Sequence, residues 1–418
     1  MATASVGIQI ELIVQKYGGA TLADPEKIKN VAKRISELHM NGKQVVVIVS
    51  AMGSTTNQLL HLASQISHQP KMRELDMLLS TGERISMSLM SMALNDLNCE
   101  AISFTGSQAG ILTDSSHFNA FIKDVKAFRV LEALEQNKIV VLAGFQGVSP
   151  ISKEITTLGR GGSDVTAVAM AANLNAKYCE ILKDVPSIFS ADPKLIPNAK
   201  PLKKLSYDHL LDMTFWGAKV LHYRSVDLAK TKNIQLIIGP AISIETADSA
   251  KKSEETIQSI QTTNEGTVIE DIYKDNYESN RILSLNSFEI VLKIQTSDSD
   301  VYSCQKKINL KFDSYQLARP QILQIQKTSN EVTIYLTAPK ESLESYFRKN
   351  NSDKIERLCS VTATCTGTTQ SETLEKIFSA LEKIQVVPEN TFISARSVIL
   401  FLPLASREKV LIALHELI

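Results

Sequence analysis

Short runs of apolar residues alternate with stretches of helical periodicity in the first part of the chain, up to about residue 245. Such alternation is typical of parallel strands joined by crossover helices. The continuous apolar run Val45–Val49 indicates a strand that is covered on both faces. Further strands are expected at Val14–Tyr17, Ile139–Ala143, Tyr178–Leu182 and Gln235–Ile238. The pattern therefore predicts an α/β sandwich built on a mainly parallel sheet.

Helix start and stop signals place two helices between these strands. Asp24 is expected to cap a helix that carries Pro25 at its first position and ends at Gly42. The Ala- and Val-rich stretch Ser163–Asn173 is expected to form another helix. Each of these helices connects two expected strands, as a parallel sheet requires.

The polar stretch Thr246–Arg281 is expected to be a domain junction, although a short strand over Val268–Ile272 is compatible with it. Beyond it, strands and amphipathic helices interleave, which suits two small βαββαβ modules of the ferredoxin-like type. The expected strands are Phe288–Gln295, Val332–Thr337, Leu358–Thr364 and Val398–Leu402, and the expected helices are Glu372–Ile384 and Arg407–Leu417. We therefore expect three domains, at residues 1–268, 269–350 and 351–418.

Composition excludes several classes of protein. With 418 residues, 44% of them hydrophobic and 22% charged, the chain can bury a sizeable core. The 45 basic residues balance 45 acidic ones, so no overall field attracts nucleic acid or an anionic membrane. No apolar run approaches the ~18 residues of a membrane span, and a secretory signal is not expected. Five cysteines without a C-x-x-C pair indicate buried thiols in the reducing cytoplasm, and neither they nor an H-E-x-x-H motif predict a metal site.

The segment Lys16-Tyr17-Gly18-Gly19 follows an expected strand and precedes the helix capped by Asp24. Two glycines at such a turn let backbone N–H groups approach an anion, and the lysine adds positive charge. An ordinary strand-end turn is the alternative interpretation of so short a pattern. No G-x-x-x-x-G-K-[ST] or H-R-D motif occurs, which disfavours the P-loop and protein-kinase architectures.

The segment Thr156–Asp164 reads Thr-Thr-Leu-Gly-Arg-Gly-Gly-Ser-Asp and directly precedes a helix. Backbone donors and the helix dipole attract an anion there, and Arg160 can hold a carboxylate or phosphate with two parallel hydrogen bonds. Ser163 and Asp164 can equally serve as the helix cap. A cap alone does not explain three glycines beside an arginine, so the pattern favours a binding loop.

Four more polar segments complete the candidate chemistry, and they are Ser80–Arg84 at an expected helix start, Ser50–Asn57, Lys183–Val185 followed by Ala191–Lys194, and Gly217–His222. Each has an ordinary alternative: a dipole-favoured glutamate, a polar loop, a solvated lysine or a structural histidine. Five of the polar segments follow apolar strands, which places them at one edge of one sheet. The set suits an acceptor with a carboxylate and an amine beside a polyphosphate donor.

The sequence resembles the aspartokinase branch of the amino acid kinase family. Lys16–Gly19 is similar to the K-F-G-G start of that family, and Leu78–Glu83 to its L-L-S-x-G-E stretch. Thr156–Asp164 and Gly217–His222 match T-T-L-G-R-G-G-S-D and G-A-K-V-L-H without a mismatch. The resemblance covers about residues 12–270, and over the remaining third a faint similarity to paired ACT regulatory domains is best in Leu358–Ile418.

The resemblance implies a three-layer amino acid kinase domain followed by two ACT-like modules. It implies transfer of the γ-phosphate of Mg-ATP to the side-chain carboxylate of L-aspartate, the entry step to lysine, threonine and methionine. By this resemblance, the phosphoryl group is held and the site is ordered by Lys16, Gly18, Gly19 and Asp164. The residues that the resemblance implies for binding aspartate are Ser50, Thr56, Glu83, Arg160 and Ser163. The residues that it implies for binding the nucleotide are Lys16, Gly18, Gly19, Lys183, Asp184, Phe189, Lys194 and Lys219. Lysine as an effector and a homodimer or larger assembly through the ACT modules are further implications.

The sequence departs from the family pattern mainly around the nucleotide. The departures are Ala20 for Thr, Lys183 for Thr, Ser187 for Gly, Phe189 for Tyr, Lys194 for Arg and Tyr223 for Pro. The resemblance therefore implies less about the affinity for the nucleotide than about the binding of aspartate. Two other functions stay open: an amino acid kinase for N-acetylglutamate, glutamate or UMP, and an amino acid sensor with an inactive kinase domain.

Overall fold

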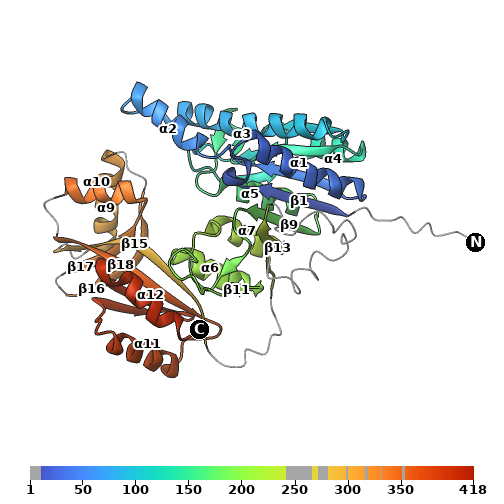
Figure 1. Ribbon diagram of the computed structural model, residues 1–418. Helices are drawn as coiled ribbons and strands as arrows, with labels where there is room; N and C mark the ends of the chain where they lie inside the picture. Colours follow the sequence, from blue (N-terminus) through green and yellow to red (C-terminus); the bar gives the residue numbers. More distant parts are fainter. Residues whose placement is uncertain are drawn as a thin grey trace, which may run out of the picture. The chain divides into compact units, whose positions relative to one another are not determined.

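The structure is a computed structural model, and it describes residues 11–241, 266–271, 281–297, 300–315, 319–329, 331–350 and 354–418. The chain forms two compact units (Figure 1). The second consists of Phe189–Lys200, Asp212–Ala218 and Lys274–Ile418, and the first of the rest of the chain up to Tyr273. The second unit is thus made of three segments that are not continuous in sequence. The division into three domains at residues 268 and 350 stays a prediction.

The first unit is built on an eight-stranded sheet. Its strands are, in spatial order, β12 (Lys204–Leu205), β14 (Thr267–Ile269), β13 (Leu236–Pro240), β9 (Tyr178–Lys183), β1 (Leu12–Tyr17), β2 (Gln44–Val49), β6 (Ile139–Ala143) and β3 (Ala101–Phe104). All neighbouring pairs are parallel except β13 and β14. The predicted mainly parallel sheet is confirmed, and the carboxyl ends of β1, β2, β6 and β9 lie at one edge.

Helices cover both faces of this sheet and make it a three-layer sandwich. On one face, α1 (Pro25–Met40) and α3 (Met72–Asn95) pack on alternate residues of β1 and β2 in one apolar cluster. On the other, α5 (Gly162–Asn173) lies against the opposite residues of the same strands, beside α7 (Tyr223–Lys232). Asp24 caps α1 by accepting from the Lys27 N–H, and Pro25 is its first residue, as predicted. The shorter helices of this part are η1 (Gly19–Leu22), α2 (Thr55–Ile66) and α4 (Phe128–Glu135), and α6 (Tyr207–Phe215) has residues in both units.

A small four-stranded sheet stands beside the main one. Its order is β5 (Ile122–Val125), β4 (Ile111–Thr113), β7 (Gln146–Val148) and β8 (Ile155–Thr157). It matters for the site because β8 leads directly into the Gly-rich segment before α5. Two further short strands are β10 (Ile188–Phe189) and β11 (Pro201–Leu202).

The second unit has one antiparallel six-stranded sheet. Its order is β16 (Gln321–Lys327), β17 (Val332–Thr337), β15 (Ile282–Thr296), β18 (Lys354–Cys365), β20 (Ser397–Pro403) and β19 (Asn390–Ile393). Its helices are α9 (Val301–Ser314), α10 (Lys340–Lys349), α11 (Ser371–Lys383), η2 (Leu404–Ser406) and α12 (Arg407–His415). Two separate apolar cores form, one under α9 and α10 and one under α11 and α12, and both use β15 and β18. The expected pair of ferredoxin-like modules is thus present as two halves of one sheet.

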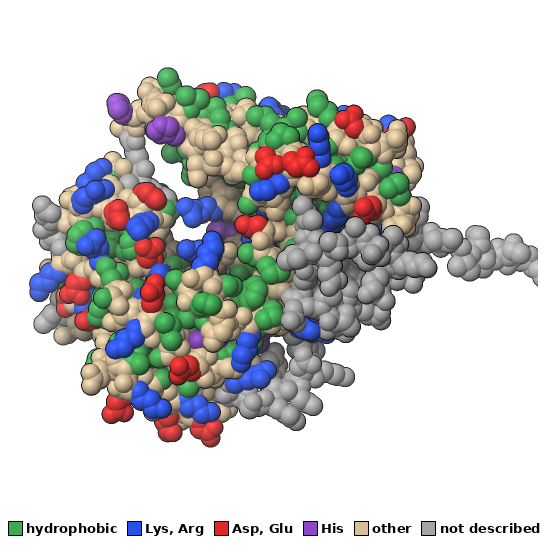
Figure 2. Space-filling model, in the orientation of Figure 1, with side chains coloured by type: hydrophobic (Ala, Val, Ile, Leu, Met, Phe, Trp, Pro, Cys, Tyr) green, Lys and Arg blue, Asp and Glu red, His purple; other side chains and the backbone are tan. Residues whose placement is uncertain are grey.

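Polar side chains on the visible face are mixed in sign. Figure 2 shows lysine and arginine side chains interspersed with aspartate and glutamate over the described residues. All five cysteines are buried and unpaired, as predicted. Among the described residues, no helix is long and apolar enough to span a lipid bilayer. Most of the expected junction Thr246–Arg281 lies outside the described residues, and β14 overlaps the short strand Val268–Ile272 considered there.

The prediction that a helix opens at Ser80–Arg84 is wrong, because α3 begins at Met72. The hydroxyls of Ser80 and Thr81 donate to main-chain carbonyls of the preceding turn, at 3.0 and 2.6 Å, instead of capping a helix end. Glu83 therefore lies in the middle of α3, where no terminal dipole acts on it.

The polar segments are also distributed differently from the prediction of one sheet edge. Those after β1, β2 and β9 do lie at the edge of the main sheet. In contrast, Thr156–Asp164 begins in β8 of the small sheet and runs into α5, Ser80–Arg84 lies within α3, and Lys219 precedes α7 in a loop. The site is therefore assembled from one sheet edge, one helix and two loops.

Candidate active site

A buried ion pair between Lys16 and Asp164 lies at the centre of the candidate site. The Lys16 ammonium on β1 lies 2.7 Å from the carboxylate of Asp164, which is in the first turn of α5. The two side chains are only 8% and 7% exposed, so each depends on the charge of the other. Gly144 allows α5 to approach the sheet, because a Cβ at this residue would lie 2.7 Å from that of Ser163.

The turn after β1 places two glycines close to the Lys16 ammonium. Gly19 is required by packing, because a Cβ there would lie 2.6 Å from the Ala51 carbonyl oxygen. At Gly18, by contrast, an added Cβ would meet nothing closer than 3.8 Å, and one of those atoms is Lys16 Nζ. The φ of Gly18, −73°, is also ordinary for any residue. Packing and backbone shape therefore do not require a glycine at this position, which lies next to Lys16 Nζ.

Helix α3 brings Glu83 to the loop that follows β2. Gly82 allows the contact, because a Cβ there would lie 2.8 Å from that of Ala51. The Ala51 N–H then donates to Glu83 Oε1 at 3.2 Å, while Oε2 is buried without a hydrogen-bond partner among the described residues. Glu83 is 4% exposed, and burial raises the pKa of its carboxyl from 4.5 to about 7. A buried oxygen without a donor marks a place where an ammonium group of a ligand can bind.

Replacing Glu83 by Gln is expected to change how stability depends on pH. Folded Glu83 keeps its proton up to about pH 7, whereas the unfolded chain loses it near 4.5. The stability of the ligand-free protein therefore falls as pH rises between these values, by about 3 kcal/mol for this group. Glu83→Gln removes this pH-dependent loss. In urea unfolding, the free energy of unfolding of the variant should therefore rise relative to that of the wild type between pH 5 and pH 8. Equal pH dependence of the two proteins would contradict the burial of this carboxyl.

The Gly-rich loop before α5 presents Arg160 to solvent. Gly159 and Gly161 have φ angles of 73° and 69°, a region that favours glycine. Gly161 also packs on His222, whose Cβ would lie 2.3 Å from an added Cβ. Arg160 is exposed, and within the described residues no hydrogen bond or ion pair holds its guanidinium. The guanidinium fork is thus available for a carboxylate or a phosphate, as the sequence predicts.

Lys183, at the end of β9, contacts the loop that carries Lys219. The Lys183 ammonium donates a hydrogen bond to the main-chain carbonyl of Val220. Burial lowers the pKa of Lys183, and the carboxylate of Asp164 opposes this shift. Because β9 is the neighbour of β1, with Leu182 opposite Tyr17, Lys183 lies at the same sheet edge as Lys16. Lys219 itself is exposed.

The remaining predicted residues divide between the two compact units. Ser50 follows β2, and its N–H donates to the Tyr17 carbonyl at 3.2 Å, which holds this loop against the turn after β1. Thr56 is in the first turn of α2, and Asp184 is exposed after β9. Phe189 and Lys194 belong to the second unit, and their role at the nucleotide stays a prediction.

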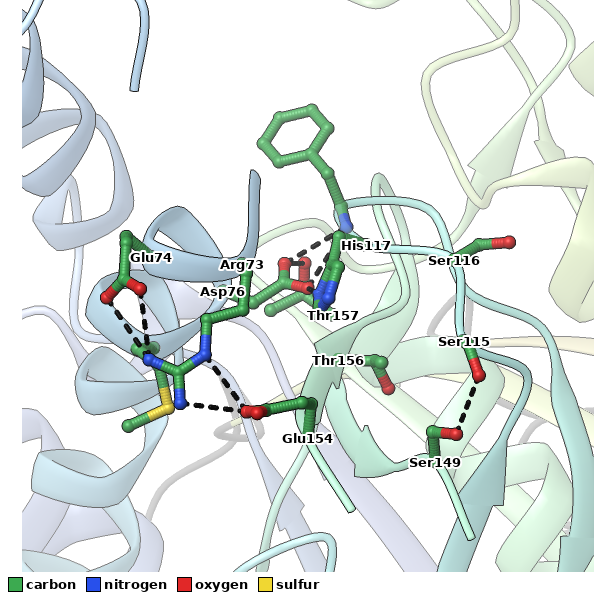
Figure 3. Close-up of polar contacts among 12 residues, drawn as sticks. Arg73, Glu74, Asp76, Ser115, Ser116, His117, Ser149, Glu154, Thr156 and Thr157 are labelled. Atoms are coloured by element: carbon green, nitrogen blue, oxygen red, sulfur yellow. Dashed lines mark hydrogen bonds and ion pairs between the residues drawn. The ribbon is translucent and has the colours of Figure 1, made fainter. Parts of the chain in front are cut away.

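Asp76 was not predicted as a site residue from the sequence. It is a fully buried carboxylate on α3 that contacts His117 and Thr157 (Figure 3). The one local signal is an acidic residue next to Leu75 on the apolar side of an amphipathic helix. Its partners are distant in sequence, so no motif spacing reveals them. Among the described residues, no group of three or more His, Cys, Asp or Glu side chains is arranged to hold a metal ion.

Comparison with curated proteins supports a kinase relationship. An aspartokinase of Mycolicibacterium smegmatis is 52% identical over 246 residues, which are 59% of this chain and 58% of that protein. An aspartokinase of Corynebacterium glutamicum is 52% identical over 232 residues, 56% of this chain and 55% of the relative. These matches span little more than half the length of the relatives.

Solved structures extend the likeness to nearly the whole chain. Aspartokinase III of E. coli, in complex with aspartate and ADP, has a TM-score of 0.75 and 20% identity, and the match covers 97% of this chain and 99% of that one. At that identity the likeness concerns the fold. The aspartate kinase from Synechocystis is 30% identical, with a TM-score of 0.53 over 97% of this chain and 68% of that one.

A family model gives the assignment. The model described as the amino acid kinase family matches residues 11–240, which contain Lys16, Glu83, Arg160, Asp164 and Lys183. The matched region ends with β13, the last strand before the undescribed residues 242–265. Because this model covers more than half of the chain, and aspartokinases match both its kinase region and nearly its whole length, the chain belongs to the amino acid kinase family, on its aspartokinase branch.

Proposed function

We propose that this protein is an aspartate kinase, which transfers the γ-phosphate of Mg-ATP to the side-chain carboxylate of L-aspartate and forms 4-phospho-L-aspartate. The observation that carries the proposal is the buried Lys16–Asp164 pair at the Gly18–Gly19 turn. A buried ammonium beside a glycine turn at the end of a strand is suited to a transferring phosphoryl group. The identity of the relatives selects aspartate among possible acceptors.

The transfer depends on positioning and on charge stabilisation more than on covalent chemistry. The attacking carboxylate of aspartate is already ionised at neutral pH, so no general base is needed. Lys16 neutralises charge on the phosphoryl oxygens, and Asp164 holds the ammonium in place at 2.7 Å. Gly18 carries no side chain beside this ammonium, and Gly19 lets the turn pack against the Ala51 carbonyl. Mg²⁺ enters with the nucleotide.

Aspartate lies between Arg160 and Glu83 in this proposal. The free guanidinium of Arg160 pairs with the α-carboxylate through two parallel hydrogen bonds. The unpaired Oε2 of Glu83 accepts from the α-ammonium, which favours the ionised form of this carboxyl. Ser50, Thr56 and Ser163 supply hydroxyl groups around the substrate.

The nucleotide is assigned to Lys183, Asp184, Phe189, Lys194 and Lys219. Support comes from Lys183, whose bond to the Val220 carbonyl holds the loop that carries Lys219. In the family pattern this position is a threonine, whose side chain is too short for that bond. Lys183 thus makes a contact to this loop that a threonine could not make.

A regulatory role is assigned to the second unit, with lysine as effector and the paired modules as the surface of a homodimer or larger assembly. Support comes from its fold and from aspartokinase III of E. coli, which has also been solved in complex with lysine and aspartate and shares the fold at a TM-score of 0.69 and 20% identity. The product would enter the synthesis of lysine, threonine and methionine.

An acyl-phosphate trap tests the proposed activity. The full chain with Mg-ATP and hydroxylamine should give aspartate hydroxamate only when aspartate is present. Glutamate and N-acetylglutamate in place of aspartate serve as matched acceptors for the hydroxamate readout. UMP, whose phosphorylated product is not an acyl phosphate, is followed through the release of ADP. Added lysine should lower the yield if lysine is the effector. Product with another acceptor alone would assign a different amino acid kinase. Aspartate binding without any transfer would assign a sensor.

A further inference from the structure

Two chain segments meet at the base of the Arg160 loop. They are the turn 117–120 after β4 and the residues 157–159 at the end of β8. The N–H of Ala120 donates to the Thr157 carbonyl at 2.9 Å. A Cβ at Gly159 would lie 2.7 Å from the side-chain oxygen of Asn119, so the two segments are in direct contact.

Asp76 on α3 binds both segments from one side (Figure 3). This side chain is 0% exposed. Its carboxylate accepts from the Thr157 hydroxyl at 2.5 Å and from the Phe118 N–H at 3.0 Å, and lies 2.6 Å from His117 Nδ1. Phe118 has a φ of 67°, a costly conformation for a residue with a side chain, and the Asp76 carboxylate holds its N–H in place.

Arg224, in the first turn of α7, binds the same two segments through other atoms. Its guanidinium donates to the Leu158 carbonyl at 2.8 Å, to the Asn119 side-chain oxygen at 2.8 Å and to the Ala120 carbonyl at 2.7 Å. Each segment is therefore held by one buried carboxylate and one guanidinium, which come from different helices.

We propose that Asp76 and Arg224 are positioning residues, which fix the backbone that carries Arg160 and thereby the site for the α-carboxylate of aspartate. The proposal rests on the proposed function for the identity of the ligand. Arg160 follows Gly159 directly, and no contact within the described residues holds its own guanidinium. Its position therefore depends on the backbone of residues 157–159. Buried hydrogen bonds to charged groups are strong enough to hold such a loop.

Helix α3 also connects this arrangement with Glu83. Asp76 and Glu83 are about two helical turns apart and so share one face of α3. One rigid helix thus holds the Arg160 loop through Asp76 and presents Glu83 itself. In this proposal, α3 sets the distance between the groups that bind the carboxylate and the ammonium of the substrate.

The test compares Asp76→Asn with a matched variant of the same helix. Asn removes the charge of Asp76 and replaces Oδ2, which also accepts from the Phe118 N–H at 3.2 Å, with an NH₂ donor. The bonds that Oδ1 accepts from Thr157 and Phe118 then go to a neutral acceptor and are weaker. The KM for aspartate should rise about 10-fold, as expected when a buried hydrogen-bond partner is removed, with the KM for ATP within about 2-fold. Arg73→Ala is the control, because the Arg73–Glu154 ion pair, at 2.8 Å, joins α3 to the residue before β8 without touching either segment (Figure 3). Its KM values should not change.

A second variant and a second readout keep the outcomes separate. Thr157→Val removes only the hydroxyl that bonds to Asp76, and the KM for aspartate should rise in it as well. Amide hydrogen exchange of residues 157–163 should be faster in both variants than in Arg73→Ala, whatever the substrate. The positioning role would be overturned if amide exchange in the two variants equalled that in Arg73→Ala. It would also be overturned if kcat fell and both KM values rose by the same factor. If the wild type does not phosphorylate aspartate but the variants differ in amide exchange as expected, only the proposed function would be overturned.

Discussion

Lys16→Met is expected to lower kcat roughly 10²- to 10³-fold, the scale for losing one group that stabilises charge in the transition state. Methionine keeps most of the volume of the side chain and removes its charge. Steady-state kinetics with aspartate and ATP varied in turn should place the loss in kcat, because the α-carboxylate and ammonium of aspartate are assigned to Arg160 and Glu83. An unchanged kcat in the folded variant would remove Lys16 from the mechanism.

The ion pair with Asp164 calls for a control, because Lys16→Met leaves a buried carboxylate without its counter-ion. Breaking such a pair destabilises a protein by about 3–5 kcal/mol. The double variant Lys16→Met, Asp164→Asn removes both charges and should recover stability without recovering kcat. Recovery of activity in the double variant would show that Lys16 serves only to balance Asp164.

Much of the fold follows from local pattern. The cap at Asp24 and the continuous apolar runs of β2 and β6 are local signals, and the structure has α1 and both strands where they predict them. Helix α3 is the exception, because Ser80, Thr81 and Gly82 resemble a helix start. They are tolerated inside the helix, where two hydroxyls bond back to the preceding turn and Gly82 lets α3 touch Ala51.

The site could be predicted in part. Gly19, Gly159 and Gly161 are demanded by close packing or positive φ, and their motifs carry that information in the sequence. The long-range partners are not local signals: the Lys16–Asp164 pair joins β1 to α5, and the contacts of Asp76 join α3 to two distant segments. Which charged residues meet is decided by the packing of helices on sheets, which motif spacing does not record.

The second unit shows a similar limit. Alternating strands and amphipathic helices predict two modules, and two apolar cores are present. That both cores use β15 and β18 is a property of strand pairing over long separations. In β15 a register irregularity between Phe288 and Val291 marks the passage from one half to the other.

Arg160→Lys is expected to raise the KM for aspartate about 10-fold or more, as the loss of ~1.4 kcal/mol of binding implies. The guanidinium can meet a flat carboxylate with two parallel N–H···O bonds, and a lysine ammonium cannot reproduce that geometry. Arg160 is exposed and lies between glycines, so the exchange should leave stability almost unchanged, which thermal unfolding can check.

The same variant separates two roles for Arg160. If Arg160 binds the α-carboxylate, the KM for ATP should move much less than that for aspartate, since the phosphates are assigned to Lys16, the Gly18–Gly19 turn and Lys219. If it contacts the γ-phosphoryl group instead, kcat falls and the KM for aspartate hardly changes. Asp76→Asn should resemble Arg160→Lys in the first case, because both then weaken one carboxylate site. A defect mainly in kcat would therefore reject the carboxylate role of Arg160, and with it the ligand assigned to the loop that Asp76 and Arg224 hold.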